Sequence, residues 1–274
     1  MKFRRSERLI DMTNYLLDHP RELVPLTYFA ERYGSAKSSI SEDLGIIKDT
    51  FEKRGIGVLQ TVPGAAGGVK FYVNVDEKEA SSLIDDLCSI MASPDRLLPG
   101  GYLYMNDILG NPVLLRRVGR VIASAYAKAE IDAVMTVATK GIPIAYAVAG
   151  FLNVPVIIVR RDPKVTEGST VSINYVSGSS KRIQTMVLSK RSLSEGSRVL
   201  IVDDFMKAGG TVKGMIDLLQ EFNAKVAGIS VLVESEETEE RLVDDYISLV
   251  RLSNVDVIGK KITVSEGKYR RISK

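Results

Sequence analysis

The sequence predicts an α/β protein, with a central and mainly parallel sheet preceded by a small helical module. Beyond about residue 123, apolar runs of strand length alternate with helical patterns, as they do in a parallel sheet with crossover helices. Up to residue 75 the pattern is instead short helices followed by a glycine-rich hairpin. The two patterns meet near residues 74–78, so we expect two domains, 1–74 and 75–274.

Composition narrows the class of protein. Of 274 residues, 45% are hydrophobic, 26% charged and 7% aromatic, as in globular proteins, and the net charge of +3 does not identify a nucleic-acid binder. No apolar run reaches membrane-spanning length. The single cysteine, Cys88, excludes an internal disulfide, suits a cytoplasmic location and is expected to pack in a core. The single histidine, His19, is expected to cap a helix before Pro20, so we predict no metal site and no histidine-based triad.

The first 74 residues have a winged helix-turn-helix outline. Helices are predicted over 6–17, 26–33 and 37–53, and strands over 57–62 and 69–73. The third helix is expected to bury four side chains at spacings of four, three and four: Ile40, Leu44, Ile47 and Phe51. Residues 63–68, rich in glycine, would form the tip of the wing.

Polar residues at the start of that third helix favour DNA binding. Short side chains there permit entry into the major groove, a glycine wing lets backbone amides approach a phosphate, and a basic cluster opens the first helix. The predicted DNA-binding residues are Arg4, Arg5, Arg8, Lys37, Ser38, Ser39, Ser41, Gly67, Gly68 and Lys70. A dimerisation or regulatory module without DNA contact is the alternative, and 11 basic against 9 acidic residues in this region do not exclude it.

The second domain begins its alternation with a strand over 133–137, a turn over 138–143, a helix over 144–151 and a strand over 154–160. The turn can present backbone amides and Lys140 to a diphosphate. The alternative is a plain strand–helix turn, which would not need a lysine beside Gly141. Taken alone, the lysine beside the glycine is weak evidence for a diphosphate loop.

Three further segments carry expectations. Residues 162–181 are rich in small polar side chains and predict a mobile hairpin over a pocket, with a surface loop as the alternative. Tyr102 is a candidate lid residue, although a core tyrosine fits nearly as well. The acidic run 234–240 and the apolar pattern over 242–250 predict a capped surface helix.

Residues 199–211 are the most informative stretch. Four apolar residues form a buried strand, the carboxylates of Asp203 and Asp204 follow, and a Gly-Gly-Thr loop opens a helix over 212–222. The acids can accept hydrogen bonds from a ribose diol, directly or through a hydrated metal ion. The loop amides and the helix dipole can hold a 5′-phosphate. An ordinary strand–turn–helix unit rarely needs the apolar run, the acid pair and the Gly-Gly-Thr loop together.

This stretch resembles the phosphoribosyl-pyrophosphate (PRPP) signature of type I phosphoribosyltransferases. The turn at 138–143, the segment 162–181 and the 199–211 motif occur in the order of that fold's pyrophosphate, flexible and PRPP loops, so the resemblance covers roughly 78–274. With the preceding winged helix, the stretches 37–43, 63–68 and 166–175 resemble the purine operon repressors of Gram-positive bacteria across almost the whole chain.

The resemblance implies a homodimeric, DNA-binding repressor of purine biosynthesis and transport genes, with PRPP as an inducer that weakens operator binding. It implies diol-binding acids at 203–204, a 5′-phosphate loop at 208–211 and a pyrophosphate loop at 139–141. The predicted effector-binding residues are Tyr102, Thr139, Lys140, Gly141, Asp203, Asp204, Phe205, Lys207, Ala208, Gly209, Gly210 and Thr211. PRPP would bind alone or with Mg²⁺, no cofactor is required, and a guanosine alarmone is a candidate competitor.

The motif departs from common enzymes at Phe205, Met206 and Lys207, where small or catalytically suited residues are frequent. We therefore predict sensing rather than catalysis and assign no catalytic residue. The alternative is an active purine phosphoribosyltransferase with an accessory helical domain. That enzyme needs a base pocket, for which residues 251–256 are the only plausible stretch.

Overall fold

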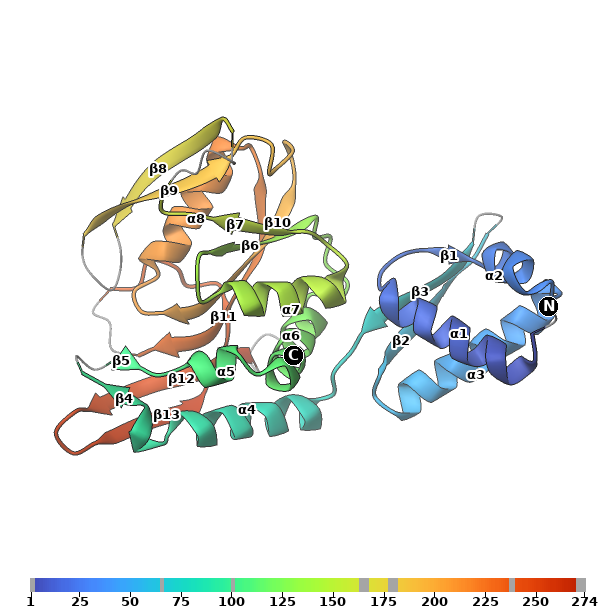
Figure 1. Cartoon of the computed structure of the whole chain (residues 1–274), viewed down its shortest axis with the longest axis horizontal. Coiled ribbons are helices and arrows are strands. Elements are labelled where there is room, and N and C mark those ends of the chain that lie inside the picture. The colour runs from blue at the N-terminus through green and yellow to red at the C-terminus, as the bar shows by residue number, and fades with distance from the viewer. Residues whose placement is uncertain are drawn as a thin grey trace.

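The computed structural model describes residues 3–64, 67–99, 102–162, 168–176, 182–236 and 240–269 (Figure 1). Within these ranges, no helix is long and apolar enough to cross a membrane. The elements are α1 (Arg5–Asp18), β1 (Val24–Pro25), α2 (Leu26–Tyr33), α3 (Lys37–Lys53), β2 (Gly57–Val62), β3 (Gly68–Val73), α4 (Glu77–Met91), η1 (Pro94–Arg96), β4 (Leu97–Leu98), β5 (Tyr102–Leu103), α5 (Asn106–Leu109), α6 (Pro112–Ala125), β6 (Ala133–Val137), α7 (Ile142–Leu152), β7 (Val156–Val159), β8 (Thr170–Val176), β9 (Ile183–Ser189), β10 (Arg198–Met206), α8 (Gly210–Glu221), β11 (Lys225–Ser235), β12 (Ile247–Asp256) and β13 (Lys261–Glu266).

The N-terminal module contains three helices and an antiparallel sheet in the order β1-β3-β2. Its core consists only of residues that precede residue 72, among them the fully buried Met12, Phe29 and Ile40. The predicted helices and strands are confirmed to within about two residues. His19 is the C-cap of α1, and its Nδ1 lies 2.8 Å from the Tyr15 carbonyl oxygen, so its predicted capping position is confirmed.

The larger domain is built on a six-stranded sheet in the order β13-β12-β11-β10-β6-β7, and only β13 runs antiparallel to its neighbour. Helices α4, α6 and α7 cover one face, while α8 and the β8–β9 hairpin cover the other (Figure 1). Alternate residues of β10 therefore enter two different cores: Leu200 and Val202 on the first face, and Val199 and Ile201 on the second. This double burial explains the continuous apolar run in the sequence.

The expected surface helix after residue 234 is wrong. Strand β11 continues through Ser235, β12 begins at Ile247, and the described residues 240–246 contain no helix. Glu234 is 1% exposed, because its strand lies between β10 and β12 and its carboxylate is bonded to side chains from later segments. From the sequence alone, a run of glutamates at the end of a strand looks the same as a run at the start of a helix. The partners of Glu234 that distinguish the two lie in later segments.

Two arginines join the module to the larger domain. The Arg21 guanidinium donates to the backbone carbonyls of Leu152 at 3.0 Å and Ala129 at 2.6 Å. Arg120, on α6, donates to the carbonyls of Gly55 and Ile56 at the end of α3. These four carbonyls lie at the end of helix α7 and in turns, so each arginine satisfies acceptors that have no helical partner.

Candidate effector pocket and DNA interface

A cavity of about 910 Å³ lies where β6 and β10 end and α7 and α8 begin. Parallel sheets bind ligands at this edge, beyond the carboxyl ends of their strands. All of the predicted effector-binding residues line the cavity except Gly141. Tyr102 is among them and is 68% exposed, so it is not a core tyrosine.

The two acids project from the last residues of β10. Asp203 is 6% exposed, and one of its oxygens accepts a hydrogen bond from the backbone amide of Asp204 at 2.9 Å. Burial raises the pKa of Asp203 well above the usual range, and the neighbouring Asp204 carboxylate raises it further. Burial also raises the pKa of Asp204, against the opposing charge of Lys140. Both carboxylates thus lie in an environment that disfavours their charge, and hydroxyl donors would offset this cost.

The Gly-Gly-Thr loop forms the N-terminus of α8. Gly209 has φ 88°, a left-handed conformation that favours glycine, and α8 starts at Gly210 without a side-chain cap. Residues 207–212 all line the cavity. The first amides of a helix lack intrahelical acceptors and carry the positive end of its dipole, so this wall suits an anion such as phosphate.

Gly141 lies behind the cavity wall rather than in it. A methyl group added at this position would collide with the Thr136 hydroxyl and lie 2.9 Å from Oδ1 of Asp203. Only glycine allows the start of α7 to pack this closely against the acid. The buried Thr136 hydroxyl has no hydrogen-bond partner among the described residues. Thr139 and Lys140, which precede Gly141, face the cavity as predicted for a diphosphate loop.

Sequence reasoning missed part of the lining. Arg160 and Arg161 follow β7 and bring two cations to the edge of the cavity beside Lys140. They could have been found, because β7 is a parallel strand whose carboxyl end meets the same sheet edge as β6. Leu252 and Val255 also line the cavity, and both belong to the 251–256 stretch considered for a base pocket.

The segment expected to cover the pocket is described in part. Asp162 lines the cavity, and residues 170–176 form β8, which pairs with β9 as an antiparallel hairpin. Residues 163–167 and 177–181 lie outside the described part of the chain.

The start of α3 presents the residues predicted to read DNA. Lys37, Ser38 and Ser41 are exposed, while Ser39 and Lys70 are partly buried. Ala36 precedes the helix and provides no side-chain cap, so the helix amides are open to an external acceptor. At the wing, residues 65–66 lie outside the described chain.

Several of the predicted DNA contacts have intramolecular partners. Oδ1 of the buried Asp43 accepts from Arg5 at 2.8 Å, and its Oδ2 accepts from Arg8 at 2.8 Å. The Arg8 side chain is only 13% exposed, so it ties α1 to α3, whereas Arg4 remains exposed. Side chains at Gly67 and Gly68 would collide with the module's own backbone, which explains both glycines without DNA. Their DNA contacts stay predictions.

These features define the class of protein: a winged-helix module joined to a phosphoribosyltransferase fold whose acid pair and Gly-Gly-Thr loop face one cavity. Comparison with protein-family models agrees. Residues 4–73 match the family described as "Bacterial purine repressor, N-terminal", and residues 105–265 match the "Phosphoribosyl transferase domain".

Full-length relatives narrow the assignment. The chain is 65% identical over 274 residues to the purine biosynthesis transcriptional repressor PurR of Bacillus subtilis (strain 168), covering 100% of this chain and 96% of that protein. It is 48% identical over 264 residues to the purine biosynthesis transcriptional activator PurR of Lactococcus lactis subsp. lactis (strain IL1403), covering 96% and 97%. The chain therefore belongs to the family of bacterial purine biosynthesis transcriptional regulators.

Enzymes are similar to part of the chain. A xanthine phosphoribosyltransferase of Lactococcus lactis subsp. cremoris (strain SK11) is 30% identical over 146 residues, which cover 52% of this chain and 74% of the enzyme. The adenine phosphoribosyltransferase structure from Thermoanaerobacter pseudethanolicus superposes with a TM-score of 0.53 at 22% identity, covering 61% of this chain and 98% of that one. The structural match shows the fold alone.

Proposed function

We propose that this protein represses purine biosynthesis and transport genes, and that PRPP is the inducer that enters the cavity and weakens operator binding. The observation that carries the proposal is the meeting of the acid pair, the Gly-Gly-Thr loop and Lys140 around one cavity in a chain with a winged helix. Relatives are named both repressor and activator. The 65% identity to a repressor favours repression.

PRPP fits the order of groups along the cavity. Its ribose diol would donate to Asp203 and Asp204, its 5′-phosphate would accept from the loop at 208–211, and its diphosphate would lie near Lys140 and Arg161. A Mg²⁺ ion would arrive bound to that diphosphate, since Mg²⁺ usually keeps several waters and binds through substrate phosphates. The described residues contain no cluster of three or more metal-ligating side chains that would hold the ion by themselves.

The same cavity suits a guanosine alarmone as a competitor of PRPP. Such a ligand carries pyrophosphoryl groups for the two anion-binding loops and a base for the apolar side formed by Phe205, Leu252 and Val255. Competition binding tests this idea. Mutually exclusive occupancy supports a shared site, and independent, additive occupancy of both ligands would remove the alarmone from this cavity.

A homodimer is the expected operator-binding form. Winged modules that read symmetric operators act in pairs, and one module alone reads only a half-site. Exposed apolar side chains on α6 and α7, Val113 at 71% and Tyr146 at 58%, offer surface for a second copy. Sedimentation equilibrium at micromolar concentration should give twice the chain mass, and a monomer would contradict the dimer.

The test of the proposed function is an operator mobility-shift titration with and without PRPP. Wild-type protein should lose affinity for operator DNA when PRPP is added, and Asp203→Ala should bind operator but ignore PRPP. Asp217→Ala is the matched control, because Asp217 is a partly exposed aspartate on α8 paired only at the surface with Lys213. An unaltered PRPP response in Asp203→Ala would place the effector site elsewhere.

An active purine phosphoribosyltransferase is the second candidate, favoured by the 30% identity to a xanthine phosphoribosyltransferase. We expect no turnover, since bulky residues follow the acids at Phe205 and Met206. Incubation with PRPP, Mg²⁺ and each purine base decides the matter. Nucleotide formation at rates typical of enzymes, roughly 1 s⁻¹ or faster, would reverse this assignment.

A further inference from the structure

A buried carboxylate lies one strand away from the acid pair. Glu234 is the penultimate residue of β11, where it is opposite Met206 of β10 and Arg251 of β12. It is 1% exposed and does not line the cavity, although the next residue, Ser235, does. An unpaired charge at such a position would strongly destabilise the fold, so the Glu234 carboxylate requires hydrogen-bond partners.

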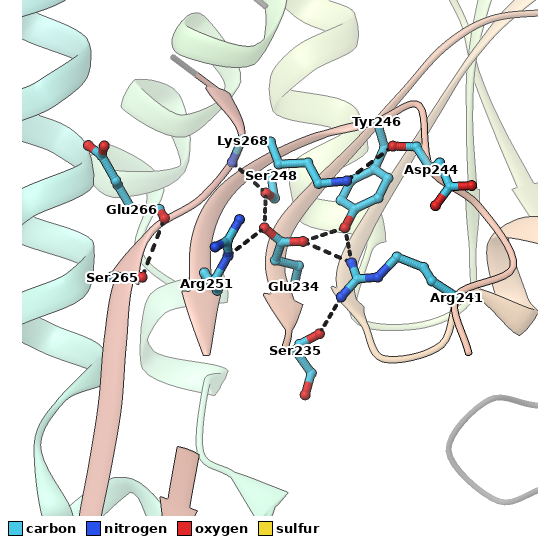
Figure 2. Close-up of polar contacts among 10 residues, drawn as sticks. All are labelled: Glu234, Ser235, Arg241, Asp244, Tyr246, Ser248, Arg251, Ser265, Glu266 and Lys268. Carbon is cyan, nitrogen blue, oxygen red and sulfur yellow. Dashed lines mark hydrogen bonds and ion pairs between the residues drawn. The ribbon is translucent and has the colours of Figure 1, made fainter. Parts of the chain in front are cut away.

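Figure 2 shows four side chains that converge on this carboxylate. Oε2 of Glu234 accepts from Nη1 of Arg241 at 2.8 Å and from the hydroxyl of Tyr246. Oε1 accepts from Oγ of Ser248 at 3.0 Å and from Nε of Arg251 at 3.2 Å. Both oxygens thus have two partners each, and the partners come from two consecutive segments: residues 240–246 and strand β12, which follows them.

Residues 240–246, which we term the brace, pack directly on the phosphate loop. The backbone amide of Leu242 donates to the carbonyl of Ala208 at 2.9 Å. The buried Val243 covers Gly209, since a methyl group added to that glycine would lie 3.5 Å from Cγ2 of Val243. The brace therefore contributes both a hydrogen bond and packing to the loop, through residues that do not themselves line the cavity.

The brace depends on the buried cluster for its own position. It contains no helix, and Arg241 holds it twice: to Glu234, and through Nη2 to the carbonyl of Ser235 at 2.7 Å. At its other end, the ammonium of Lys268 lies 3.7 Å from the ring centroid of Tyr246 and donates to the carbonyl of Asp244 (Figure 2). Removing the charge of Glu234 would loosen Arg241 and Tyr246 together.

We propose that Glu234 is a positioning residue for the effector's 5′-phosphate, acting through Arg241 and the brace to hold Ala208 and Gly209 in the binding conformation. The proposal rests on the function proposed above. Loop amides bind an anion well only when they are held in place before the ligand arrives. The brace contacts the 5′-phosphate loop and not the loop at 139–141. Loss of Glu234 should therefore weaken binding of the 5′-phosphate and spare binding of the diphosphate.

Two arginine variants separate positioning from general support. Arg241→Met and Arg251→Met each remove one cation from Glu234, and their side chains are similarly exposed at 19% and 24%. Only Arg241 belongs to the brace. Glu234→Gln completes the set. Isothermal titration would measure the Kd of each variant for PRPP, for ribose 5-phosphate and for inorganic pyrophosphate, which lacks the 5′-phosphate.

We expect Glu234→Gln and Arg241→Met to weaken binding of PRPP and ribose 5-phosphate about tenfold, the size of one lost charged hydrogen bond. Pyrophosphate affinity should change less than about twofold in these variants, as should all three affinities in Arg251→Met. Operator affinity without ligand reports folding. If Glu234→Gln fails to fold, Arg241→Met alone decides the matter.

Distinct outcomes overturn the inference. Unchanged ribose 5-phosphate affinity in Arg241→Met would show that the brace does not position the loop. An equal loss for pyrophosphate, or an equal loss in Arg251→Met, would show a general structural effect. If the wild-type protein binds none of the three probes, the proposed effector site fails and this inference fails with it. If only the variants behave unexpectedly, the effector site stands.

Discussion

The guanidinium of Arg21 donates to the carbonyl of Leu152 at 3.0 Å, and this bond joins the DNA-binding module to the last residue of α7. The same helix begins at Ile142, directly after the loop that carries Lys140 into the cavity. One helix of 11 residues, about 16 Å long, therefore has the cavity loop with Lys140 at one end and the module at the other.

Arg21→Ala should uncouple the two ends. A packed helix can transmit a shift along its axis, and the Arg21 bonds would pass that shift of α7 to the module. Without Arg21, the module loses the hydrogen bonds to Leu152 and Ala129. We expect PRPP affinity to stay within about twofold, and the PRPP-induced loss of operator affinity to shrink about fivefold or more, the lower end of typical coupling energies. Operator titrations at saturating PRPP measure it. Arg116→Ala, an exposed arginine of α6, is the control. Full coupling in Arg21→Ala would rule out this path.

Gly141→Ala should abolish effector binding without loss of DNA binding. The added methyl group would displace either the Thr136 hydroxyl or Asp203, both of which lie under the start of α7. Gly150→Ala is a control on the same helix, since nothing lies within 4 Å of its added methyl group. Alanine there should be neutral or stabilise the helix by up to about 1 kcal/mol. Fluorescence titration with PRPP measures both variants, and normal binding by Gly141→Ala would contradict the close packing.

Asp203→Asn should stabilise the ligand-free protein. Because the pKa of Asp203 is raised on folding, the folded state holds a proton at pH values where the unfolded chain, titrating near 3.9, has lost it. The stability of the wild type therefore falls as pH rises from that value to the raised pKa. Each unit of elevation costs about 1.4 kcal/mol at higher pH.

Thermal melts of wild type and Asp203→Asn between pH 4 and 8 test this sign. The advantage of the variant should grow with pH and then level off above the folded pKa, and its PRPP response should be lost. Asp217→Asn, at the surface of α8, should shift stability by less than about 0.5 kcal/mol. A variant that is less stable than wild type at pH 7 would contradict the argument.

Lys37→Ala should affect operator binding, whereas Arg8→Ala should affect folding stability. Lys37 is exposed at the start of α3, so its loss should weaken operator binding and reduce the salt dependence by about one ion. Arg8 is paired with the buried Asp43, and its loss should lower stability by about 1–3 kcal/mol. Salt-dependent operator titrations and chemical denaturation separate the two effects. Equal stability of Arg8→Ala and wild type would return Arg8 to the list of candidate DNA contacts.

Local patterns predicted most of the fold and most of the cavity. The apolar run of β10, the acid pair and the Gly-Gly-Thr loop are contiguous, so their chemistry can be read from neighbouring residues. The same holds for the cap at His19. Arg160 could have been added in the same way, because the carboxyl end of the parallel strand β7 meets the sheet edge at which the cavity lies.

The buried cluster marks where local reading failed. Glutamates after residue 233 have the composition of a helix start, and nothing nearby shows that Glu234 is paired with Arg241 and Arg251. The pairing depends on the return of β12 beside β11. In the same way, Arg5 and Arg8 read as free cations until α3 places Asp43 between them.

The raised pKa of Asp203 would give binding of the proposed effector a calorimetric signature. A diol donates to an ionised carboxylate, so a ligand that binds in this way would expel any proton that the carboxyl holds. The heat of binding would then include the ionisation heat of the buffer that takes up the proton. Wherever lower pH protonates that carboxyl, the same concentration of the proposed effector would release less of the protein from DNA. The burial of one side chain would thus make the proposed response to PRPP depend on proton activity as well.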